Sequence, residues 1–179
     1  GPEQAEVRAL AFSPAGQMFA VNDGGSMGGE SQPDWLYRID PQTGQTVRVG
    51  NTGLVGLQGL DFSPAGVLYG WDVGAGSGLG LVTINPLTGL ATDVNPAVGG
   101  TVAQAQTVGF GPDGLLYGTR NALYTIDVGT GALTLVGSGG YADVRGIAVV
   151  PEPGHAALLL LGLLTFWLRR RAVRSALPG

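Results

Sequence analysis

Residues 60–70 read Leu60-Asp61-Phe62-Ser63-Pro64-Ala65-Gly66-Val67-Leu68-Tyr69-Gly70. The same pattern occurs twice more, as Leu10-Ala11-Phe12-Ser13-Pro14-Ala15-Gly16-Gln17-Met18-Phe19-Ala20 and Val108-Gly109-Phe110-Gly111-Pro112-Asp113-Gly114-Leu115-Leu116-Tyr117-Gly118. The phenylalanines Phe12, Phe62 and Phe110 are 50 and 48 residues apart. In each copy a Pro–x–Gly turn separates two apolar stretches, because proline presets φ and glycine accepts a positive φ. The pattern therefore predicts three equivalent pairs of strands.

A second repeated block follows each copy and predicts two more strands. It reads Leu36-Tyr37-Arg38-Ile39-Asp40-Pro41-Gln42-Thr43-Gly44, Leu81-Val82-Thr83-Ile84-Asn85-Pro86-Leu87-Thr88-Gly89 and Leu123-Tyr124-Thr125-Ile126-Asp127-Val128-Gly129-Thr130-Gly131. We expect Asp40, Asn85 and Asp127 to start turns by binding nearby backbone. Four antiparallel strands at this period are typical of a β-propeller blade. The sequence predicts an all-β, propeller-like repeat domain over residues 1–150, with units at 7–53, 57–100 and 105–142 and a partial unit at 144–150.

The repeats resemble blades of bacterial propellers in the NHL, YVTN and quinoprotein-like range. The resemblance rests on the F-S/G-P-x-G-x-L-Y and D-P-x-T-G elements and covers residues 7–150. Trp71-Asp72 is a lone dipeptide, expected in a loop, and does not support a WD40 assignment. Three units and one strand are fewer than the four to eight blades of ordinary propellers, so we interpret the chain as part of a larger propeller. A β-sandwich and a β-solenoid are the alternatives.

The last thirty residues have a different character. Pro151-Glu152-Pro153 precedes an apolar run from Ala156 to Leu168, which is followed by Arg169-Arg170-Arg171. The run has 13 residues, about 20 Å as a helix, against a hydrocarbon core of about 30 Å. By length alone it fits a buried helix. The flanking prolines and arginines favour a membrane helix with the arginines on the cytoplasmic side.

This order of elements over residues 151–174 resembles the PEP-CTERM sorting signal of Gram-negative bacteria that make extracellular polysaccharide. The resemblance implies recognition of Pro151, Glu152 and Pro153 by the membrane enzyme exosortase, with Arg169, Arg170 and Arg171 as the stop. It also implies an inner-membrane anchor with the repeats outside the cytoplasm, and later a place at the cell surface or in the matrix. Residues 1–6 lack the pattern of an export signal, so we expect a mature form or a fragment.

Composition narrows the function classes. The chain has no cysteine, which excludes disulfides and thiolate metal sites. Residues 1–153 hold five arginines and thirteen acids, a net charge of −8, whereas residues 154–179 carry +4. An acidic domain argues against a nucleic-acid partner. The basic end, directly after an apolar run, is typical of a membrane flank, so the lipid bilayer is an expected partner.

The other candidate residues are better explained by structural roles than by catalysis or ligand binding. His155, the single histidine, is read as a spacer, since no G-x-S-x-G elbow accompanies it. The loop 22–34 gathers Asp23, Glu30 and Asp34, whose oxygens suit Ca²⁺, but it lacks EF-hand spacing and is read as a solvated loop. The glycine-rich stretch 74–80 lacks a phosphate-binding fingerprint. We expect packing between blades for Phe12, Phe62, Phe110, Tyr69 and Tyr117, and packing ahead of sugar stacking for Trp35, Tyr37 and Trp71.

These observations predict a non-enzymatic binding or structural module of the extracellular polysaccharide matrix of a biofilm, with no cofactor. The alternative is a polysaccharide lyase or hydrolase whose active site lies in the central channel, on blades outside this chain. Such a site needs clustered acids, bases or tyrosines on the innermost strands. Asp61 is the one candidate we identify there. A purely structural piece without a ligand is the third reading.

Overall fold

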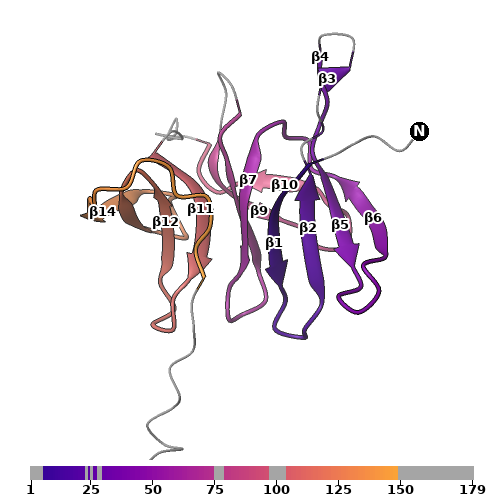
Figure 1. Cartoon of the computed structure of the whole chain (residues 1–179), viewed down its shortest axis with the longest axis horizontal. Helices are drawn as coiled ribbons and strands as arrows, with labels where there is room; N and C mark the ends of the chain where they lie inside the picture. Colours follow the sequence, from indigo (N-terminus) through magenta and orange to yellow (C-terminus); the bar gives the residue numbers. More distant parts are fainter. Residues whose placement is uncertain are drawn as a thin grey trace, which may run out of the picture. The chain divides into compact units, whose positions relative to one another are not determined.

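The computed structural model describes residues 6–22, 24, 26–27, 30–74, 79–96 and 104–148. Within them the chain forms three four-stranded antiparallel sheets, each a simple meander (Figure 1). The all-β prediction is confirmed. Sheet 1 contains β1 (Val7–Phe12), β2 (Met18–Asn22), β5 (Trp35–Ile39) and β6 (Thr46–Asn51). Sheet 2 contains β7 (Leu57–Phe62), β8 (Leu68–Asp72), β9 (Gly80–Ile84) and β10 (Ala91–Asp93).

Sheet 3 contains β11 (Ala105–Phe110), β12 (Leu116–Arg120), β13 (Leu123–Ile126) and β14 (Leu133–Gly137). Each sheet lies within one of the predicted units. A short hairpin of β3 (Ser26–Met27) and β4 (Glu30–Ser31) stands in the loop between β2 and β5, where the sequence predicted only a loop. The first strands of the sheets lie beside one another, with β7 in contact with both β1 and β11.

The turns between strands form where the repeated motifs predict them. Gly16, Gly66 and Gly114 have φ values of 77°, 84° and 80°, and each donates its N–H to the residue three positions earlier. A side chain in these positions would be strained, because L-residues rarely adopt a positive φ. The second turn of each unit ends likewise on Gly44, Gly89 or Gly131. The glycines therefore set where each strand reverses.

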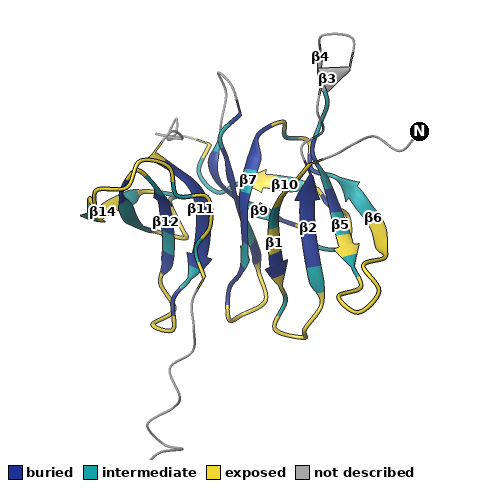
Figure 2. Cartoon of the chain, viewed as in Figure 1, coloured by how far each residue is buried: buried dark blue, intermediate teal, exposed yellow. Residues whose placement is uncertain are grey.

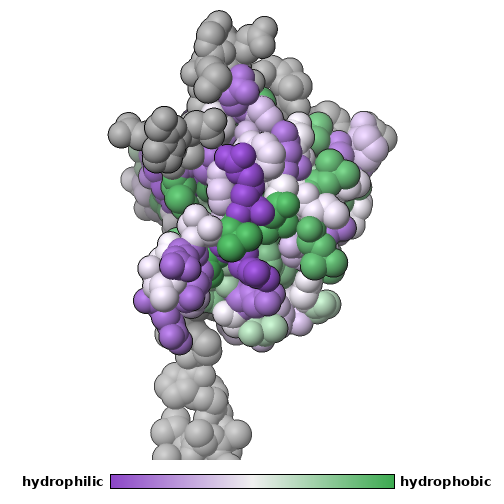
Figure 3. All heavy atoms as spheres, turned by 90° about the vertical axis from the view of Figure 1, so that its right-hand side faces the viewer, coloured by the Kyte–Doolittle hydropathy of each residue, from purple (hydrophilic) through white to green (hydrophobic). Residues whose placement is uncertain are grey.

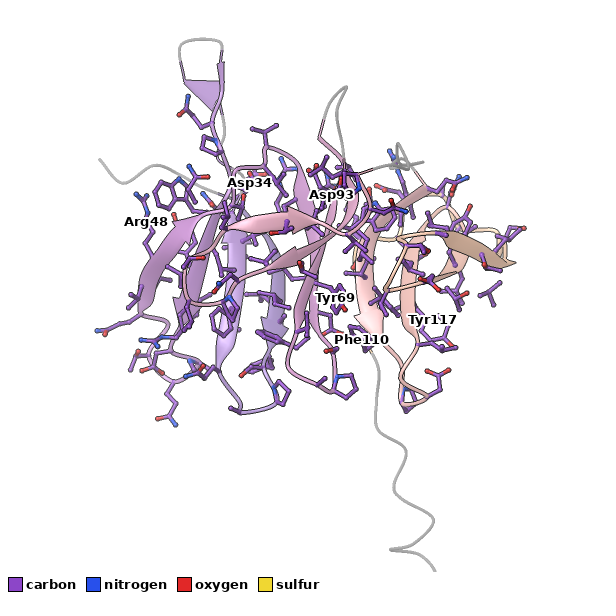
Figure 4. All side chains as sticks on the ribbon, turned by 180° about the vertical axis from the view of Figure 1, so that it is seen from behind. Asp34, Arg48, Tyr69, Asp93, Phe110 and Tyr117 are labelled. Carbon is purple, nitrogen blue, oxygen red and sulfur yellow. The ribbon has the colours of Figure 1, made fainter. Side chains whose placement is uncertain are left out.

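The sheets pack face to face through the residues that the repeats share. The first core cluster joins sheets 1 and 2, and the second joins sheets 2 and 3. An aromatic pair sits in each interface. The ring centroids of Phe19 and Phe62 are 5.5 Å apart. Those of Tyr69 and Phe110, labelled in Figure 4, are 5.6 Å apart. Figure 2 shows the buried residues on β2, β7 and β11. The predicted packing between blades is confirmed for Phe62, Tyr69 and Phe110.

Phe12 departs from the prediction that it packs between blades. It is 55% exposed, whereas the equivalent Phe62 is 8% exposed. Leu10 is likewise 49% exposed, against 4% for its equivalent Leu60. The cause is positional: Phe62 and Phe110 rest on an aromatic of the preceding sheet, and among the described residues no sheet precedes sheet 1. Figure 3, which faces the side of Figure 1 where β6 lies, shows green apolar groups among purple polar ones.

Two further expectations need correction. Trp71-Asp72 does not lie in a loop but ends strand β8, and Trp71 is 1% exposed in the second core cluster. Residues 144–148, expected to form the strand of a partial unit, carry no strand assignment. They run alongside sheet 3, with the Val144 N–H donating to the Arg120 carbonyl and Ile147 against Gly109. A strand needs a paired neighbour, and this segment has no ladder in the structure as described.

The predicted C-terminal helix and the sorting residues Pro151, Glu152, Pro153, Arg169, Arg170 and Arg171 lie outside the described residues, as does His155. Residues 150–179 group as a unit separate from residues 1–149. In the part of the chain that the structure describes, no helix combines the length and apolar character needed to cross a membrane.

Candidate functional site

Each sheet carries an irregularity at the same place in its first strand. The pairing register shifts between Val7 and Ala9 in β1, between Leu57 and Gly59 in β7, and between Ala105 and Thr107 in β11. One extra residue is thereby inserted in each strand: Arg8, Gln58 or Gln106. A β-bulge of this kind re-aims the side chain of the inserted residue, and bulges are frequent beside binding sites. The repeat thus places a long polar side chain at one equivalent point of three strands.

The bulged residues line one pocket. Arg8, Gln58 and Gln106 surround a cavity of about 620 Å³ together with Glu6, Arg120, Ala142, Asp143 and Arg145. Its size falls within the range of about 300–1,000 Å³ that is usual for small-molecule sites. Arg145 occupies the position in 144–148 that corresponds to Arg8, Gln58 and Gln106 in the repeats. Four successive repeat positions therefore converge on this cavity, which we call the bulge pocket.

Asp143 connects the polar groups on one side of the bulge pocket. Its carboxylate accepts hydrogen bonds from Gln106 Nε2 at 2.7 Å and from Arg145 Nε at 2.9 Å. The Arg145 and Gln106 hydrogen bonds, helped by the charges of Arg145 and Arg120, hold the pKa of Asp143 below its usual value. Asp143 is therefore an anion at neutral pH, and it orients two donors of the pocket.

Gln106 has a defined orientation, because its amide nitrogen also donates to the Val144 carbonyl at 3.3 Å. Both acceptors require the NH₂ group on that side, which leaves the Gln106 carbonyl oxygen as an acceptor. Arg145 has a side chain that is 81% exposed. Its Nε–H donates to Asp143.

Arg120 adds a third guanidinium through a change at one repeat position. It ends β12 and pairs with Ala105, as Asn22 pairs with Val7 and Asp72 with Leu57. Asn22 accepts the Trp35 N–H, and Asp72 accepts the N–H groups of Gly74 and Leu79, so both side chains organise local loops. In sheet 3 an arginine stands there and lines the bulge pocket instead.

Asp61, the inner-strand candidate from the sequence, has a structural role. Its carboxylate accepts the Phe62 N–H at 2.8 Å and the Phe110 N–H of the neighbouring β11 at 2.6 Å. Both oxygens are thus committed to backbone, and the side chain links sheet 2 to sheet 3. Asp61 does not line the bulge pocket.

Asp34, from the loop considered for Ca²⁺, is also committed to backbone. It is buried, and its two carboxylate oxygens accept the N–H groups of Gly24 at 2.9 Å and Leu57 at 2.8 Å. Its backbone binds Thr52 and Leu54 as well. Asp34 therefore joins the loop after β2 to the start of sheet 2. Asp23 of the same loop lies outside the described residues, and nothing is described of the Glu30 side chain.

The aromatic candidates for sugar stacking are occupied by protein. Trp71 is buried between sheets 2 and 3. The Arg48 guanidinium lies over the Trp35 ring, 4.2 Å from its centroid, and 5.9 Å from that of Tyr37. The guanidinium thus occupies one face of the Trp35 ring and lies near the Tyr37 ring. The preference for packing over stacking agrees with these contacts.

The bulge pocket offers donors and acceptors. Its lining combines three guanidinium groups, two carboxamides and two carboxylates. Within residues 6–148, as far as these are described, no group of three or more His, Cys, Asp or Glu side chains is placed to hold a metal ion. The arrangement is suited to hydrogen-bonding and charge recognition of a polar ligand.

Sequence reasoning missed the bulge pocket because it read the first strands as apolar. The signal is present nevertheless. When the four segments are written one below another, Arg8, Gln58, Gln106 and Arg145 fall in one column. Polar residues that recur at one strand position need hydrogen-bonding surroundings. The bulge that re-aims these side chains is a property of the paired strands and cannot be read from one strand alone.

Comparison with known proteins supports the fold. No protein-family model matches the chain, and no curated protein does. Among solved structures, a candidate oxidoreductase (glucose dehydrogenase) from Thermus thermophilus aligns over 84% of this chain and 57% of its own, with 21% identity and a TM-score of 0.53. A protein of unknown function from Bacteroides thetaiotaomicron aligns over 70% of this chain and 32% of its own, with 16% identity and a TM-score of 0.50.

The chain thus spans between about a third and just over half of the length of these structures. At such identities the likeness concerns the fold alone. It supports a β-propeller-like repeat architecture for the three sheets.

Proposed function

We propose that this chain is an exported surface protein whose repeat domain is a non-enzymatic binding module of an extracellular polysaccharide matrix. The observation that carries the binding role is the bulge pocket, where repeat-equivalent positions supply Arg8, Gln58, Gln106 and Arg145 to one cavity. These side chains are hydrogen-bond donors and acceptors of the kind that recognise sugar hydroxyls and acidic groups.

Delivery to the cell surface rests on the tail. Pro151-Glu152-Pro153, the apolar run and Arg169-Arg170-Arg171 resemble the PEP-CTERM signal, and exosortase is the proposed partner. In this proposal the apolar run holds the protein in the inner membrane with the repeats outside the cytoplasm. Processing then transfers the domain to the cell surface or matrix.

We further propose that the three sheets belong to a larger propeller. Leu10 and Phe12 correspond to Leu60 and Phe62, which sheet 1 covers, and they are half-exposed in sheet 1 itself. A preceding blade with an aromatic on its second strand would cover them, in the way that Phe19 covers Phe62 and Tyr69 covers Phe110. The aligned share of the solved structures, 57% or less, accords with additional blades.

The hydrogen bonds that the Asp143 and Asp61 carboxylates accept favour a binding role over a catalytic one. Asp143 is held ionised by Arg145 and Gln106, which suits a counter-ion and not a proton donor near neutral pH. Asp61 has both oxygens on backbone N–H groups. A lyase or hydrolase would need a group that exchanges a proton, and it would have to come from elsewhere in the larger propeller.

Two measurements test the proposal. Expression of the full-length gene in an exosortase-bearing host, followed by intact mass spectrometry, should show loss of the tail beyond Pro153. Retention of residues 156–171 would refute the sorting assignment. In affinity electrophoresis, gels containing extracellular polysaccharide from that host should retard the protein relative to empty gels. Equal mobility in both gels would refute the binding role.

A further inference from the structure

The bulge pocket is locally basic in an acidic domain. Three of the five arginines in residues 1–153 line it, namely Arg8, Arg120 and Arg145, whereas among the acids that the structure describes two do, namely Glu6 and Asp143. The pocket therefore has a formal charge of +1, whereas residues 1–153 as a whole, the pocket included, carry −8. A net positive cavity in a negative domain selects a ligand with localised negative charge and is unsuited to a densely charged polyanion.

The geometry of the arginines narrows the ligand further. Arginine presents a planar fork that matches a carboxylate with two parallel hydrogen bonds. Arg8 in β1 and Arg145 in the segment after sheet 3 occupy equivalent repeat positions, as do Gln58 in β7 and Gln106 in β11, and all four line the pocket. The carboxamides supply neutral groups for hydroxyls: Gln58 lines the pocket, and Gln106 offers its carbonyl oxygen as an acceptor, because its amide nitrogen already donates to Asp143 and Val144. A dianionic phosphate or sulfate-rich chain would meet Glu6 and Asp143 in the same cavity.

We propose that the bulge pocket binds a carboxylate-bearing sugar, a uronate unit, with its carboxylate on the Arg8 and Arg145 guanidinium groups and its hydroxyls on Gln58 and Gln106. This inference rests on the proposed polysaccharide-binding function and names the chemical group that is recognised. Asp143 acts as a positioning residue, because it fixes both Arg145 and Gln106. The pocket volume of about 620 Å³ accommodates a small ligand of this class.

The test is a titration of the full chain with a short oligogalacturonate by isothermal calorimetry. The same oligomer with its carboxyl groups reduced to alcohols and a sulfated neutral oligosaccharide serve as comparison probes. We expect binding of the uronate oligomer and at least tenfold weaker binding of the reduced oligomer, as the loss of charge-assisted hydrogen bonds implies. The sulfated probe should also bind at least about tenfold more weakly.

Variants locate the binding. Arg8→Gln and Arg145→Gln should each weaken uronate binding about tenfold or more. Arg145 is 81% exposed, so its replacement leaves the fold intact. Arg38→Gln is the matched control, because it makes the same charge change on β5 away from the bulge pocket. Unfolding midpoints of all variants should match that of the parent chain.

The outcomes separate the two proposals. Equal binding of the uronate and carboxyl-reduced oligomers would overturn the uronate inference and leave polysaccharide binding in place. Tighter binding of the sulfated probe, or uronate binding unchanged in both Arg8→Gln and Arg145→Gln, would also overturn it. Failure to bind any probe, together with failure to bind the matrix polysaccharide in affinity gels, would overturn the proposed function itself.

Discussion

At the scale of single residues, the acids of this chain mostly stabilise the backbone. Asp40 accepts the N–H groups of Gln42 and Thr43, Asn85 those of Leu87 and Thr88, and Asp127 those of Gly129 and Thr130. The turn role predicted for these three residues is therefore confirmed. Asn85 shows that a neutral carboxamide oxygen can accept the same two backbone hydrogen bonds. The negative charge of Asp40 and Asp127 is therefore not required to form the turn.

That charge makes two of the turns sensitive to acid. The Gln42 backbone N–H and the Thr43 side chain lower the pKa of Asp40 from its usual value, and the Thr130 side chain and the Gly129 N–H lower that of Asp127. A lowered folded-state pKa means that folding favours the ionised form. The contribution is therefore present above the unfolded-state pKa and is lost as pH falls through the folded-state value.

We predict that the double variant Asp40→Asn, Asp127→Asn loses less stability than the parent chain when pH falls below about 4, since Asn does not titrate there. Thermal unfolding midpoints between pH 2.5 and pH 7 would measure this. Asn85→Ala serves as the control, and its cost should be independent of pH. Parallel curves for the parent chain and the double variant would contradict the prediction.

The sequence indicated the turn residues but not the bulged ones. A Pro–x–Gly or Asp–x–x–Thr–Gly motif acts within a few residues, so it can be read locally. The roles of Asp34 and Asp61 depend on N–H groups 23 and 49 residues away, on Leu57 and Phe110. Only the packed sheets bring those groups into reach, and a functional reading of either acid from sequence was for that reason unsupported.

At the scale of strands and sheets, each interface repeats one aromatic contact. Phe62 lies against Phe19, and Phe110 lies against Tyr69. The equivalent Phe12 has no such partner among the described residues and is 55% exposed. The three phenylalanines share a sequence environment but differ in burial, so they form an internal comparison.

We predict that Phe62→Ala lowers the free energy of unfolding by about 3–5 kcal/mol, because it empties a buried site between two sheets. Phe12→Ala should cost less than about 1 kcal/mol in this chain, since most of the ring is already in water. The free energies of unfolding of both variants, measured by urea titration, would test this difference. In a longer chain that supplies a preceding blade, Phe12→Ala should become as costly as Phe62→Ala. If Phe12→Ala still lowers the free energy of unfolding only slightly in that longer chain, the larger-propeller proposal is contradicted.

Close approach of the first strands depends on a small residue in β7. A Cβ on Gly59 would lie 2.9 Å from the Val108 backbone nitrogen and 3.0 Å from the Thr107 Cα, both in β11. Backbone cannot move aside as a flexible side chain can. The equivalent Gly146 has open space around its missing Cβ.

We predict that Gly59→Ala destabilises the chain by about 1–3 kcal/mol through overpacking. Gly146→Ala, the matched control at the same repeat position, should change stability by less than about 0.5 kcal/mol. Denaturant midpoints would measure both. Equal effects of the two substitutions would show that sheets 2 and 3 are not held this closely by the Gly59 contact.

At the scale of the whole repeat domain, the sequence predicted the strands and their grouping well. Each four-stranded sheet follows from alternation, turn motifs and period, all of which are local or repeated signals. Residues 144–148 were less predictable. Their likeness to 7–12 predicted a strand, but a strand forms only with a paired neighbour, and pairing is decided by what lies beside the segment. The bulge pocket was missed for the same reason, because four separate segments build it.

The face of sheet 1 that no described residue covers has a consequence in solution. It exposes Leu10 and Phe12 on a first strand whose counterparts are buried. Apolar sheet surfaces and unpaired edges promote association. We predict that the sedimentation coefficient of this chain rises with concentration, and that Leu10→Lys reduces the rise. Leu87→Lys, which replaces an isolated turn leucine that is 86% exposed, is the control and should have little effect. Equal behaviour of both variants would assign the association to another surface.

The repetition of the aromatic joint also bears on how such proteins change during evolution. Because the joint between sheets 1 and 2 uses the same chemistry as the joint between sheets 2 and 3, a duplicated or deleted unit would meet a compatible neighbour at once. Recombination between the repeated segments around Phe12, Phe62 and Phe110 would therefore alter the copy number of units without requiring a new kind of interface. Ligand specificity would then diversify separately, by point changes at the four positions that face the cavity.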